Sequence, residues 1–320
     1  MPASVSILIP CHNAAPWLAQ TLESALAQTW PHKEIVLVDD GSTDDSLAIA
    51  TRFQARGVRI VAQENRGASA ARNVAIAGSR GEWLQFLDAD DLLAPDKIAR
   101  QMEMALSAGW EYLYASDWSR FQVSPADADF TPQPLCADSS PVGWVVKKFE
   151  HNAMMHPAAW LASRQLADKA GPWNEALSLD DDGEFFTRLA LASTGIRHCP
   201  GAVSFYRSSL PGSLSGRKSE QAWASAYLSI ELSADRLLSA EDSPRTRHAC
   251  ATAFQRYIYE AYPRAAACRG RAVARVAACG GSDFRPEGGP KFQRASRLLG
   301  WRFARRIQIG TNRFCHFFRE

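Results

Sequence analysis

Residues 81–98 read GEWLQFLDADDLLAPDKI, and this stretch decides how the first third of the chain folds. The apolar run Gly81–Leu87 is short and bounded by turn-forming residues, which is typical of a buried strand. Three aspartates follow it at once, namely Asp88, Asp90 and Asp91. In open α/β sheets ligands bind beyond the carboxyl ends of the strands. Carboxylates at positions i and i+2 across a tight turn can converge on one hard cation, and the alternative is a loop or helix-capping cluster.

The segments around this stretch alternate between strand and helix patterns. Strands are predicted at Ser4–Pro10, Glu34–Asp40, Val58–Ala62 and Gly81–Leu87. Helices are predicted at Pro16–Thr29, Asp44–Ala55, Ala68–Ala77, Pro95–Ser107 and Asp181–Ser193. This alternation indicates right-handed βαβ units and a mostly parallel sheet. The strand at Glu34–Asp40 also ends in carboxylates. Two acidic strand ends side by side repel each other and do not favour folding, whereas a bound cation and a nucleotide would explain them.

The composition fits a folded enzyme and argues against several other classes. The 320 residues carry 36 Lys and Arg against 34 Asp and Glu, so the net charge is +2 and a polyanion-wrapping protein is not expected. Hydrophobic residues make up 46%, which argues against wholesale disorder. No apolar run reaches the roughly 18 residues that span a bilayer, and no secretory signal is expected. The seven cysteines are odd in number and form no CxxC pair, which argues against a disulfide scaffold or a zinc site and predicts a cytoplasmic location.

Four segments occur in an order and spacing that characterise a known family. They read SVSILIPCHN from Ser4, EIVLVDDGSTDDS from Glu34, ENRGASAARN from Glu64 and GEWLQFLDADDLLAPDKI from Gly81. Together they resemble the nucleotide-sugar-binding half of a family 2 glycosyltransferase with the GT-A fold. The resemblance covers about residues 4–115 and extends more weakly to about 216. It implies an α/β catalytic domain over 1–216, with a nucleotide-sugar half to about 115 and an acceptor half after it. The rest of the chain is rich in Ala, Arg and Ser, which predicts a helical, basic C-terminal region over 217–320.

The resemblance also implies which residues bind the nucleotide. Pro10 borders the base, with His12 close by. Asp40 accepts the imide N–H of uracil, a bond that N3 of cytosine cannot donate. Arg72 matches the basic residue that contacts the nucleotide, and the alternative is a surface arginine on a helix. Gly67 permits a backbone conformation or a close approach that a side chain would prevent.

The resemblance identifies Asp88 and Asp90 as a DxD motif. Asp88 contacts the ribose or the metal, and Asp90 binds Mg²⁺ or Mn²⁺ that bridges the diphosphate of the donor. Such a cation neutralises charge that develops on the departing diphosphate. Asp91 is expected to cap the following turn instead.

A sugar transferase also needs a base that takes the proton of the acceptor hydroxyl. The segment Leu179–Phe185, LDDDGEF, resembles the acidic motif that the family carries at the start of a helix. This resemblance places the base at Asp182, although the register among Asp180, Asp181 and Asp182 stays open. The alternative is an acidic helix N-terminus that the helix dipole favours.

Three further residues are candidates for substrate contacts. Trp173 either stacks on an acceptor sugar or is a packed aromatic residue. Arg207 and Arg217 flank a segment, Pro211–Ser215, that resembles a loop closing over the diphosphate, and both can bind phosphate oxygens.

The C-terminal segment is strongly basic. From Arg285 to Glu320 there are nine Lys or Arg and two Glu. One helix over Phe292–Ile307 would place its apolar side chains on one side and its arginines opposite, with Trp301 on the basic side. Such a helix can rest on an anionic membrane surface, and the alternative is a helix packed on the catalytic domain.

These observations together predict an inverting, metal-dependent glycosyltransferase. It would move a sugar from a UDP-sugar to a hydroxyl of a saccharide or lipid-linked acceptor, in bacterial cell-surface polysaccharide synthesis. Peripheral contact with the inner face of the membrane and packing on the catalytic domain stay open as alternatives for the C-terminal region, and contact with nucleic acid is not expected. The alternative is a non-catalytic nucleotide-sugar-binding or scaffold protein. A nucleotidyltransferase would begin with a Gly-rich strand-end loop, and a Rossmann dehydrogenase needs GxGxxG after its first strand; the chain has neither.

Overall fold

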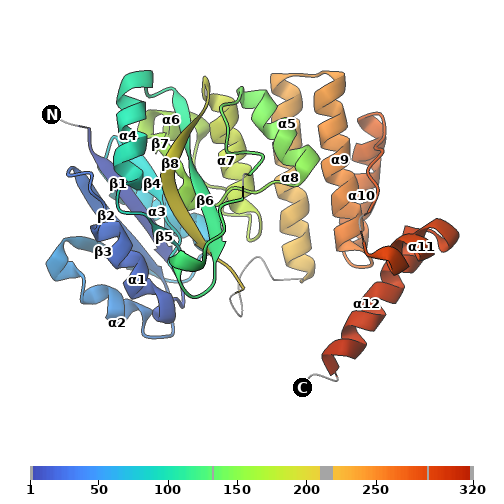
Figure 1. Cartoon of the computed structure of the whole chain (residues 1–320), viewed down its shortest axis with the longest axis horizontal. Helices are drawn as coiled ribbons and strands as arrows, with labels where there is room; N and C mark the ends of the chain where they lie inside the picture. Colours follow the sequence, from blue (N-terminus) through green and yellow to red (C-terminus); the bar gives the residue numbers. More distant parts are fainter. Residues whose placement is uncertain (1–2, 132, 210–218, 287, 318–320) are drawn as a thin grey trace.

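The computed structural model describes residues 3–131, 133–209, 219–286 and 288–317. A sheet with helices on both faces forms one half of the molecule, and C-terminal helices form the other (Figure 1). Helix α12 (Trp301–Phe317) extends away from both parts to the C-terminus. Most residues that the sequence assigns to the nucleotide and the metal lie in the strands of this sheet or directly after them, and Arg72 lies on the helix α3 (Ala68–Gly78).

The described residues form an eight-stranded sheet. Its strands lie in the order β3 (Val58–Gln63), β2 (Lys33–Asp40), β1 (Val5–Cys11), β4 (Trp83–Phe86), β7 (Trp160–Ser163), β6 (Tyr112–Phe121), β8 (Gly195–Arg207) and β5 (Leu92–Leu93). Strands β1 to β4 pair in parallel, as do β6 and β8, whereas β5 and β7 run antiparallel to their neighbours. The predicted mostly parallel α/β sheet is therefore confirmed, and the four predicted strands are present.

Helices cover both faces of this sheet. They are α1 (Ala15–Leu26), α2 (Ser46–Thr51), α3 (Ala68–Gly78), α4 (Lys97–Ala108), α5 (Pro141–His151), α6 (Arg164–Ala170) and α7 (Asp181–Ala192). Successive residues of a strand point to opposite faces. In β2, Val36 and Val38 accordingly pack into the same core as α3 and α7, whereas Ile35 and Leu37 pack into the core of α1 and α4. The predicted helix at Asp44–Ala55 is shorter than expected, since α2 ends at Thr51.

The parallel strands bring their carboxyl ends to one edge. Cys11 at the end of β1 lies opposite Asp39 of β2, and Leu8 lies opposite Phe86 near the end of β4. The residues that follow β1, β2 and β4 are therefore neighbours in space although they are far apart in the sequence. These are the strand ends at which the sequence predicts the nucleotide and the metal.

The C-terminal region is helical, as predicted. Its helices are α8 (Glu220–Ala240), α9 (Pro244–Ala261), α10 (Ala266–Ala278), α11 (Pro290–Leu299) and α12. Tyr227 of α8 and Phe254 of α9 belong to the same buried cluster as Trp160 of the sheet and Phe186 of α7. Two of these helices thus share a hydrophobic core with the sheet. The expected boundary at residue 216 lies outside the described residues.

The prediction of one helix over Phe292–Ile307 is wrong. Gly300 has a φ of +80°, a left-handed conformation that ends α11 before α12 begins. The ring of Trp301 packs edge-on against Tyr259 and Tyr262, with centroid distances of 5.6 and 5.4 Å. Within the part of the chain that the structure describes, no helix is both long and apolar enough to cross a membrane.

Candidate active site

Arg72 is the centre of the charged site at the carboxyl edge of the sheet. Its Nη2 donates to Asp88 Oδ1 and its Nη1 donates to Asp181 Oδ2, each over 2.7 Å. The guanidinium also lies 4.4 Å above the ring of Trp173. Arg72 is only 5% exposed, so the alternative of a surface arginine is wrong. The buried cation connects the acidic end of β4 to the acidic start of α7.

The two ends of the DxD motif have different surroundings. Asp88 binds Arg72 through Oδ1, while among the described residues its Oδ2 has no hydrogen-bond partner. The Asp90 carboxylate forms no bond with another described side chain, and burial, together with Asp91 and Asp88, raises its pKa to about 8. Carboxylates crowded in this way repel each other, and a divalent cation would relieve that repulsion. Oxygen-only ligands of this kind suit Mg²⁺ or Mn²⁺, so Asp88 and Asp90 fit the predicted metal.

Asp91 does not cap the following turn, contrary to expectation. It is fully buried, accepts the backbone N–H of Arg207 through Oδ1, and lies 2.8 Å from His156 Nδ1 through Oδ2. Burial lowers the pKa of His156 to about 3, so the ring is neutral at pH 7. Nε2 of this ring is 2.9 Å from Ser204 Oγ. The pair thus fixes the loop after β4 to strand β8, and both carboxylate oxygens of Asp91 take part in these contacts.

The predicted base-binding residues lie together at the ends of β1 and β2. Pro10 is buried in β1 opposite Val38. His12 is exposed, and its Nδ1 lies 2.9 Å from the backbone oxygen of Asp40. Asp40 Oδ2 accepts the backbone N–H of Gly67, whose φ of +93° a side chain would disfavour.

A neighbouring carboxylate has a free acceptor. Asp40 Oδ1 accepts from Arg66 N and Gln63 Nε2, so this oxygen is fully used. Asp39 Oδ1 is buried and, within the described chain, has no hydrogen-bond partner. Buried acceptors are nearly always satisfied in folded proteins, so the unpaired oxygen of Asp39 is an exception at this strand end.

The three consecutive aspartates at the start of α7 have distinct partners. Asp180 Oδ2 accepts from Ser229 Oγ, and Asp181 Oδ2 accepts from both Ser69 and Arg72. Asp182 Oδ1 accepts only the N–H of Gly183 among the described residues. Burial, and then the charges of Asp181 and Asp180, raise the pKa of Asp182 to about 7. Asp182 therefore combines a free oxygen with a pKa suited to accept a proton near neutral pH.

Two candidate substrate contacts are wrong. Trp173 is 2% exposed and stacks on Phe185 with centroids 4.1 Å apart, so it is the packed aromatic residue of the two alternatives. Arg207 is 3% exposed and donates to the Asp90 carbonyl, the Gln122 carbonyl and Gln20 Oε1, so these donors do not meet a phosphate. Arg217 and the loop Pro211–Ser215 lie outside the described residues.

The sequence did not predict that side chains of helix α3 bind the segment from Trp173 to Asp181. Ser69 binds Asp181, and the side chain of Asn73 binds both the backbone N–H and the carbonyl of Trp173. Ser69, Arg72 and Asn73 have i, i+3, i+4 spacing, which places all three on one face of the helix. This spacing is visible in the sequence and would have indicated a polar contact face.

A mostly parallel sheet, with two acidic strand ends and an acidic helix start meeting at its carboxyl edge, is the arrangement of a GT-A glycosyltransferase. The family model described as "Glycosyl transferase family 2" matches residues 6–114. This match covers about the first third of the chain, and it supports a glycosyltransferase of this family.

Relatives of known name support this assignment. "Glycosyltransferase GlyG" of Streptococcus pneumoniae is 27% identical over 206 residues, which is 60% of this chain and 67% of that protein. The "Succinoglycan biosynthesis protein ExoO" of Rhizobium meliloti is 39% identical over 106 residues, which is 33% of this chain but only 30% of that protein. The chain thus matches about two thirds of one relative and less than a third of the other.

Solved structures share the fold. S. aureus TarS 1-349 in complex with UDP-GlcNAc has a TM-score of 0.63 at 16% identity, covering 86% of this chain and 89% of that one. The mannosyltransferase PcManGT from Pyrobaculum calidifontis, in complex with GDP-Man and Mn²⁺, has a TM-score of 0.54 at 18% identity and covers 97% and 85%. At these identities the comparison establishes the fold alone.

Proposed function

We propose that the chain is a metal-dependent, inverting glycosyltransferase that uses a UDP-sugar. The observation that carries this proposal is the double contact of Arg72 with Asp88 and Asp181. This contact places the proposed metal-binding acids and the start of α7, which carries Asp182, on two sides of one guanidinium. Transfer of a sugar needs a metal at the donor diphosphate and a base at the acceptor hydroxyl, and these two groups must lie close together.

The residues of this site have separate roles in the proposed reaction. Asp88 and Asp90 would hold Mg²⁺ or Mn²⁺, which neutralises charge on the leaving diphosphate when it is bound. Asp182 takes the proton of the acceptor hydroxyl while that oxygen attacks the anomeric carbon from the side opposite the diphosphate. A single displacement of this kind inverts the anomeric centre. Arg72 pairs with Asp181, so that the neighbouring Asp182 is the acid left to act as base.

The nucleotide site supports a uracil base. Two carboxylates, Asp39 and Asp40, end β2 beside Pro10 and His12. Asp39 Oδ1 is unpaired and Asp40 Oδ2 accepts one bond, so each retains capacity for the imide N–H of uracil. The exposed ring of His12 lies at the same strand end, where it would border the base.

The finer assignments of the other regions are also proposals. We assign the catalytic unit to residues 1–216 and the helical region to 217–320, with the acceptor, a saccharide or a lipid-linked saccharide, bound by the second half of the catalytic unit. The reaction would serve bacterial cell-surface polysaccharide synthesis on the cytoplasmic side of the membrane. Basic and apolar side chains exposed on α11 and α12 would contact anionic lipid peripherally.

The experiment is a panel of UDP-sugars incubated with the purified chain and Mn²⁺, with UDP release as the readout. Water replaces the unknown acceptor, so slow hydrolysis of one donor is the expected result, and Asp90→Ala should abolish it. A GDP-sugar serves as the control for the base. If the chain binds UDP and Mn²⁺ but releases no UDP with any donor or added saccharide acceptor, the scaffold alternative replaces this proposal.

A further inference from the structure

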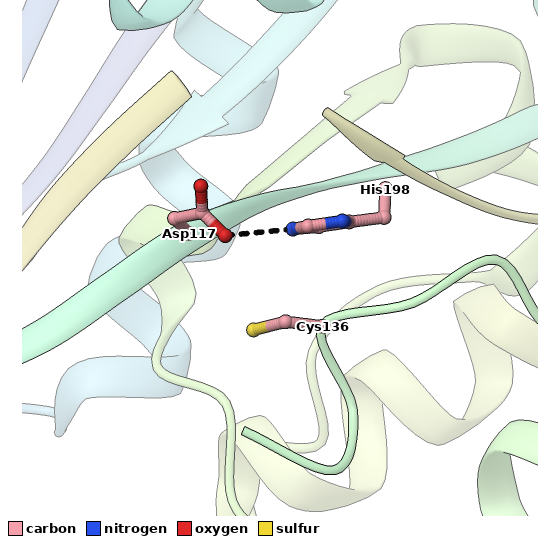
Figure 2. Close-up of side chains that lie close together, drawn as sticks. All are labelled: Asp117, Cys136 and His198. Atoms are coloured by element: carbon pink, nitrogen blue, oxygen red, sulfur yellow. Dashed lines mark hydrogen bonds and ion pairs between the residues drawn. The ribbon is translucent and has the colours of Figure 1, made fainter. Parts of the chain in front are cut away.

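Three side chains with metal-binding atoms meet outside the candidate active site. Asp117 lies on β6, His198 lies on β8, and Cys136 lies in the loop that precedes α5. One carboxylate oxygen, one ring nitrogen and the Sγ atom all lie within 4.8 Å of one another. Figure 2 shows the Cys136 side chain directed into the space beside the hydrogen-bonded pair of Asp117 and His198.

The backbone explains why these side chains converge. The parallel pairing of β6 and β8 shifts register between Ser116 and Asp117, so that Ser116 lies opposite Cys199 while Asp117 lies opposite Val203. The extra residues of β8 include Gly201, whose N–H donates to Asp117 Oδ2 over 2.8 Å. This bond orients the carboxylate, and its Oδ1 lies 2.8 Å from Nε2 of His198.

The third ligand comes from a different segment. Cys136 Sγ lies 3.7 Å from the carbonyl oxygen of Ser116, which directs the thiol toward β6. Asp138, two residues further along the same loop, accepts the backbone N–H of His198 over 2.8 Å. The loop is therefore attached to both strands, and the three ligand positions belong to one packed unit.

A cavity opens beside the cluster. It has a volume of about 360 Å³ and is lined by the three ligands together with Trp118, Phe130, Thr131, Gln133 and Val203. The three ligand residues are half-buried. A metal held by three protein ligands therefore has space for a fourth, such as water.

We propose that Asp117, Cys136 and His198 bind one Zn²⁺ ion. A thiolate sulfur, an imidazole nitrogen and a carboxylate oxygen are the ligand types of zinc, whereas Mg²⁺ and Mn²⁺ prefer oxygen-only sites. The charges of the thiolate and the carboxylate balance the two positive charges of the ion. Because zinc binds the thiolate, its binding displaces the thiol proton of Cys136 to solvent.

The sequence predicted no zinc site because it contains no CxxC pair, and that criterion does not apply to this cluster. It uses one cysteine, and its ligands come from two strands and a loop far apart in the sequence. Bound zinc would tie the loop that carries Cys136 to β6 and β8. The proposal does not depend on the proposed transferase activity, because none of the three ligands takes part in it.

The test uses the full chain, stripped of metal with a chelator and then titrated with Co²⁺ and Zn²⁺. Co²⁺ bound to a thiolate gives a charge-transfer absorption band that the oxygen-only site at Asp88 and Asp90 cannot give. Wild type and Asp90→Ala should both show this band at one ion per chain, and Zn²⁺ should abolish it by displacing Co²⁺. Zn²⁺ should also raise the melting temperature of both proteins.

Matched variants separate this cluster from other thiols. Cys136→Ser should lose the band, and His198→Gln and Asp117→Asn should weaken Zn²⁺ binding by about 100-fold or more, since even outer-shell changes weaken metal binding 10–100-fold. Cys268→Ser, which removes a thiol elsewhere, should behave as wild type. Circular dichroism confirms that each variant is folded. Absence of the band in wild type, or its persistence in Cys136→Ser, overturns the proposal.

Discussion

Nη2 of Arg72 lies 2.7 Å from Oδ1 of Asp88, and this contact joins helix α3 to the end of strand β4. The first carboxylate of the DxD motif is therefore oriented before any ligand binds. Since the other arm of the same guanidinium binds the start of α7, a change at Arg72 is transmitted to both sides of the site. The functional predictions below start from this connection.

Arg72→Lys should lower both stability and activity. A lysine keeps the charge but has no planar fork with which to bind two carboxylates at once. Breaking a buried ion pair costs about 3–5 kcal/mol when the charge is removed, and we expect a smaller loss here because the charge stays. Urea unfolding and UDP release measure the two effects.

Arg66→Lys is the matched control for Arg72→Lys. Arg66 pairs with Glu175, but both side chains are exposed, at 58% and 42%. Such pairs contribute at most about 1 kcal/mol, so this variant should unfold close to wild type. An Arg72→Lys protein with wild-type stability and UDP release would contradict the role assigned to the double contact.

Asp182 should control the pH dependence of transfer. A base must be deprotonated, and the pKa of Asp182 is raised to about 7, so kcat/KM should rise with pH through about 7 and then level off. Asp182→Asn should lower kcat by about 10²–10⁴-fold and abolish this rise, while UDP binding measured by calorimetry stays intact.

Asp180→Asn tests why the pKa of Asp182 is raised. Asp180 is one of the charges that raise the pKa of Asp182, so its removal should move the rise in kcat/KM to lower pH with little change in the plateau. Asparagine also tolerates the φ of +58° at this position. If Asp182→Asn retained the wild-type pH profile, Asp182 would not be the base.

The first part of the sheet could be predicted from the sequence because its signals are local. The apolar runs before Cys11, Asp39 and Asp88 are complete within one strand each, so the parallel sheet and the shared carboxyl edge follow from general rules of α/β proteins. The strands β5 to β8 were not predicted. Trp173 and Arg207 show where such reasoning stops. Whether an aromatic ring or a guanidinium faces a ligand or the core depends on partners far away in the chain, here Phe185 and Gln20.

The same limit applies to clusters that form only by folding. No local spacing relates Asp117 and Cys136 to His198, since the register shift between β6 and β8 brings them together. At the C-terminus, helical periodicity continued through Gly300, whereas the structure breaks there because that glycine adopts a positive φ. The backbone conformation of Gly300 thus divides a segment whose hydrophobic pattern predicts one continuous helix.

Asp90→Asn should make the metal-free chain more stable while abolishing transfer. The folded-state pKa of Asp90 is raised to about 8 from a usual value of 3.8, so the folded form holds more protons than the unfolded one between these values. The contribution of this group to the free energy of unfolding therefore falls as pH rises from about 4 to 8. In Asp90→Asn this group cannot titrate, so this decrease in stability should be absent.

Melting at pH 5 and pH 8, with and without Mn²⁺, measures this prediction. Mn²⁺ should raise the melting temperature of wild type at pH 8 but leave Asp90→Asn unchanged. Asp96→Asn is the control, because Asp96 lies directly before α4 and pairs there with Arg100, and both side chains are about half exposed. Equal Mn²⁺ stabilisation of wild type and Asp90→Asn would show that Asp90 is not a ligand.

The C-terminal helices should bind anionic vesicles through side chains that the fold leaves exposed. Phe292 and Ala304 are buried against Tyr259 and anchor α11 and α12, whereas the apolar residues Leu298, Leu299, Phe303 and Ile307 are 46–77% exposed. Exposed basic side chains accompany them, namely Lys291, Arg294, Arg297, Arg302 and Arg306. Apolar contact and attraction to anionic lipid act together in such surfaces, so binding should weaken with salt.

The double variant Phe303→Ser with Ile307→Ser should reduce binding to vesicles that contain phosphatidylserine by about 10-fold or more, since burying one large apolar side chain contributes about 1.5–3 kcal/mol. Leu106→Ser is the matched control, because Leu106 is 59% exposed on α4, far from α12 (Figure 1). Vesicle co-sedimentation measures both, with purely zwitterionic vesicles as the second comparison. A membrane surface on α11 and α12 should prefer anionic lipid, because its exposed side chains are basic as well as apolar. Equal binding to the two lipid compositions would contradict this surface. Equal loss of binding in the double variant and in Leu106→Ser would also contradict it, because only the double variant changes α12.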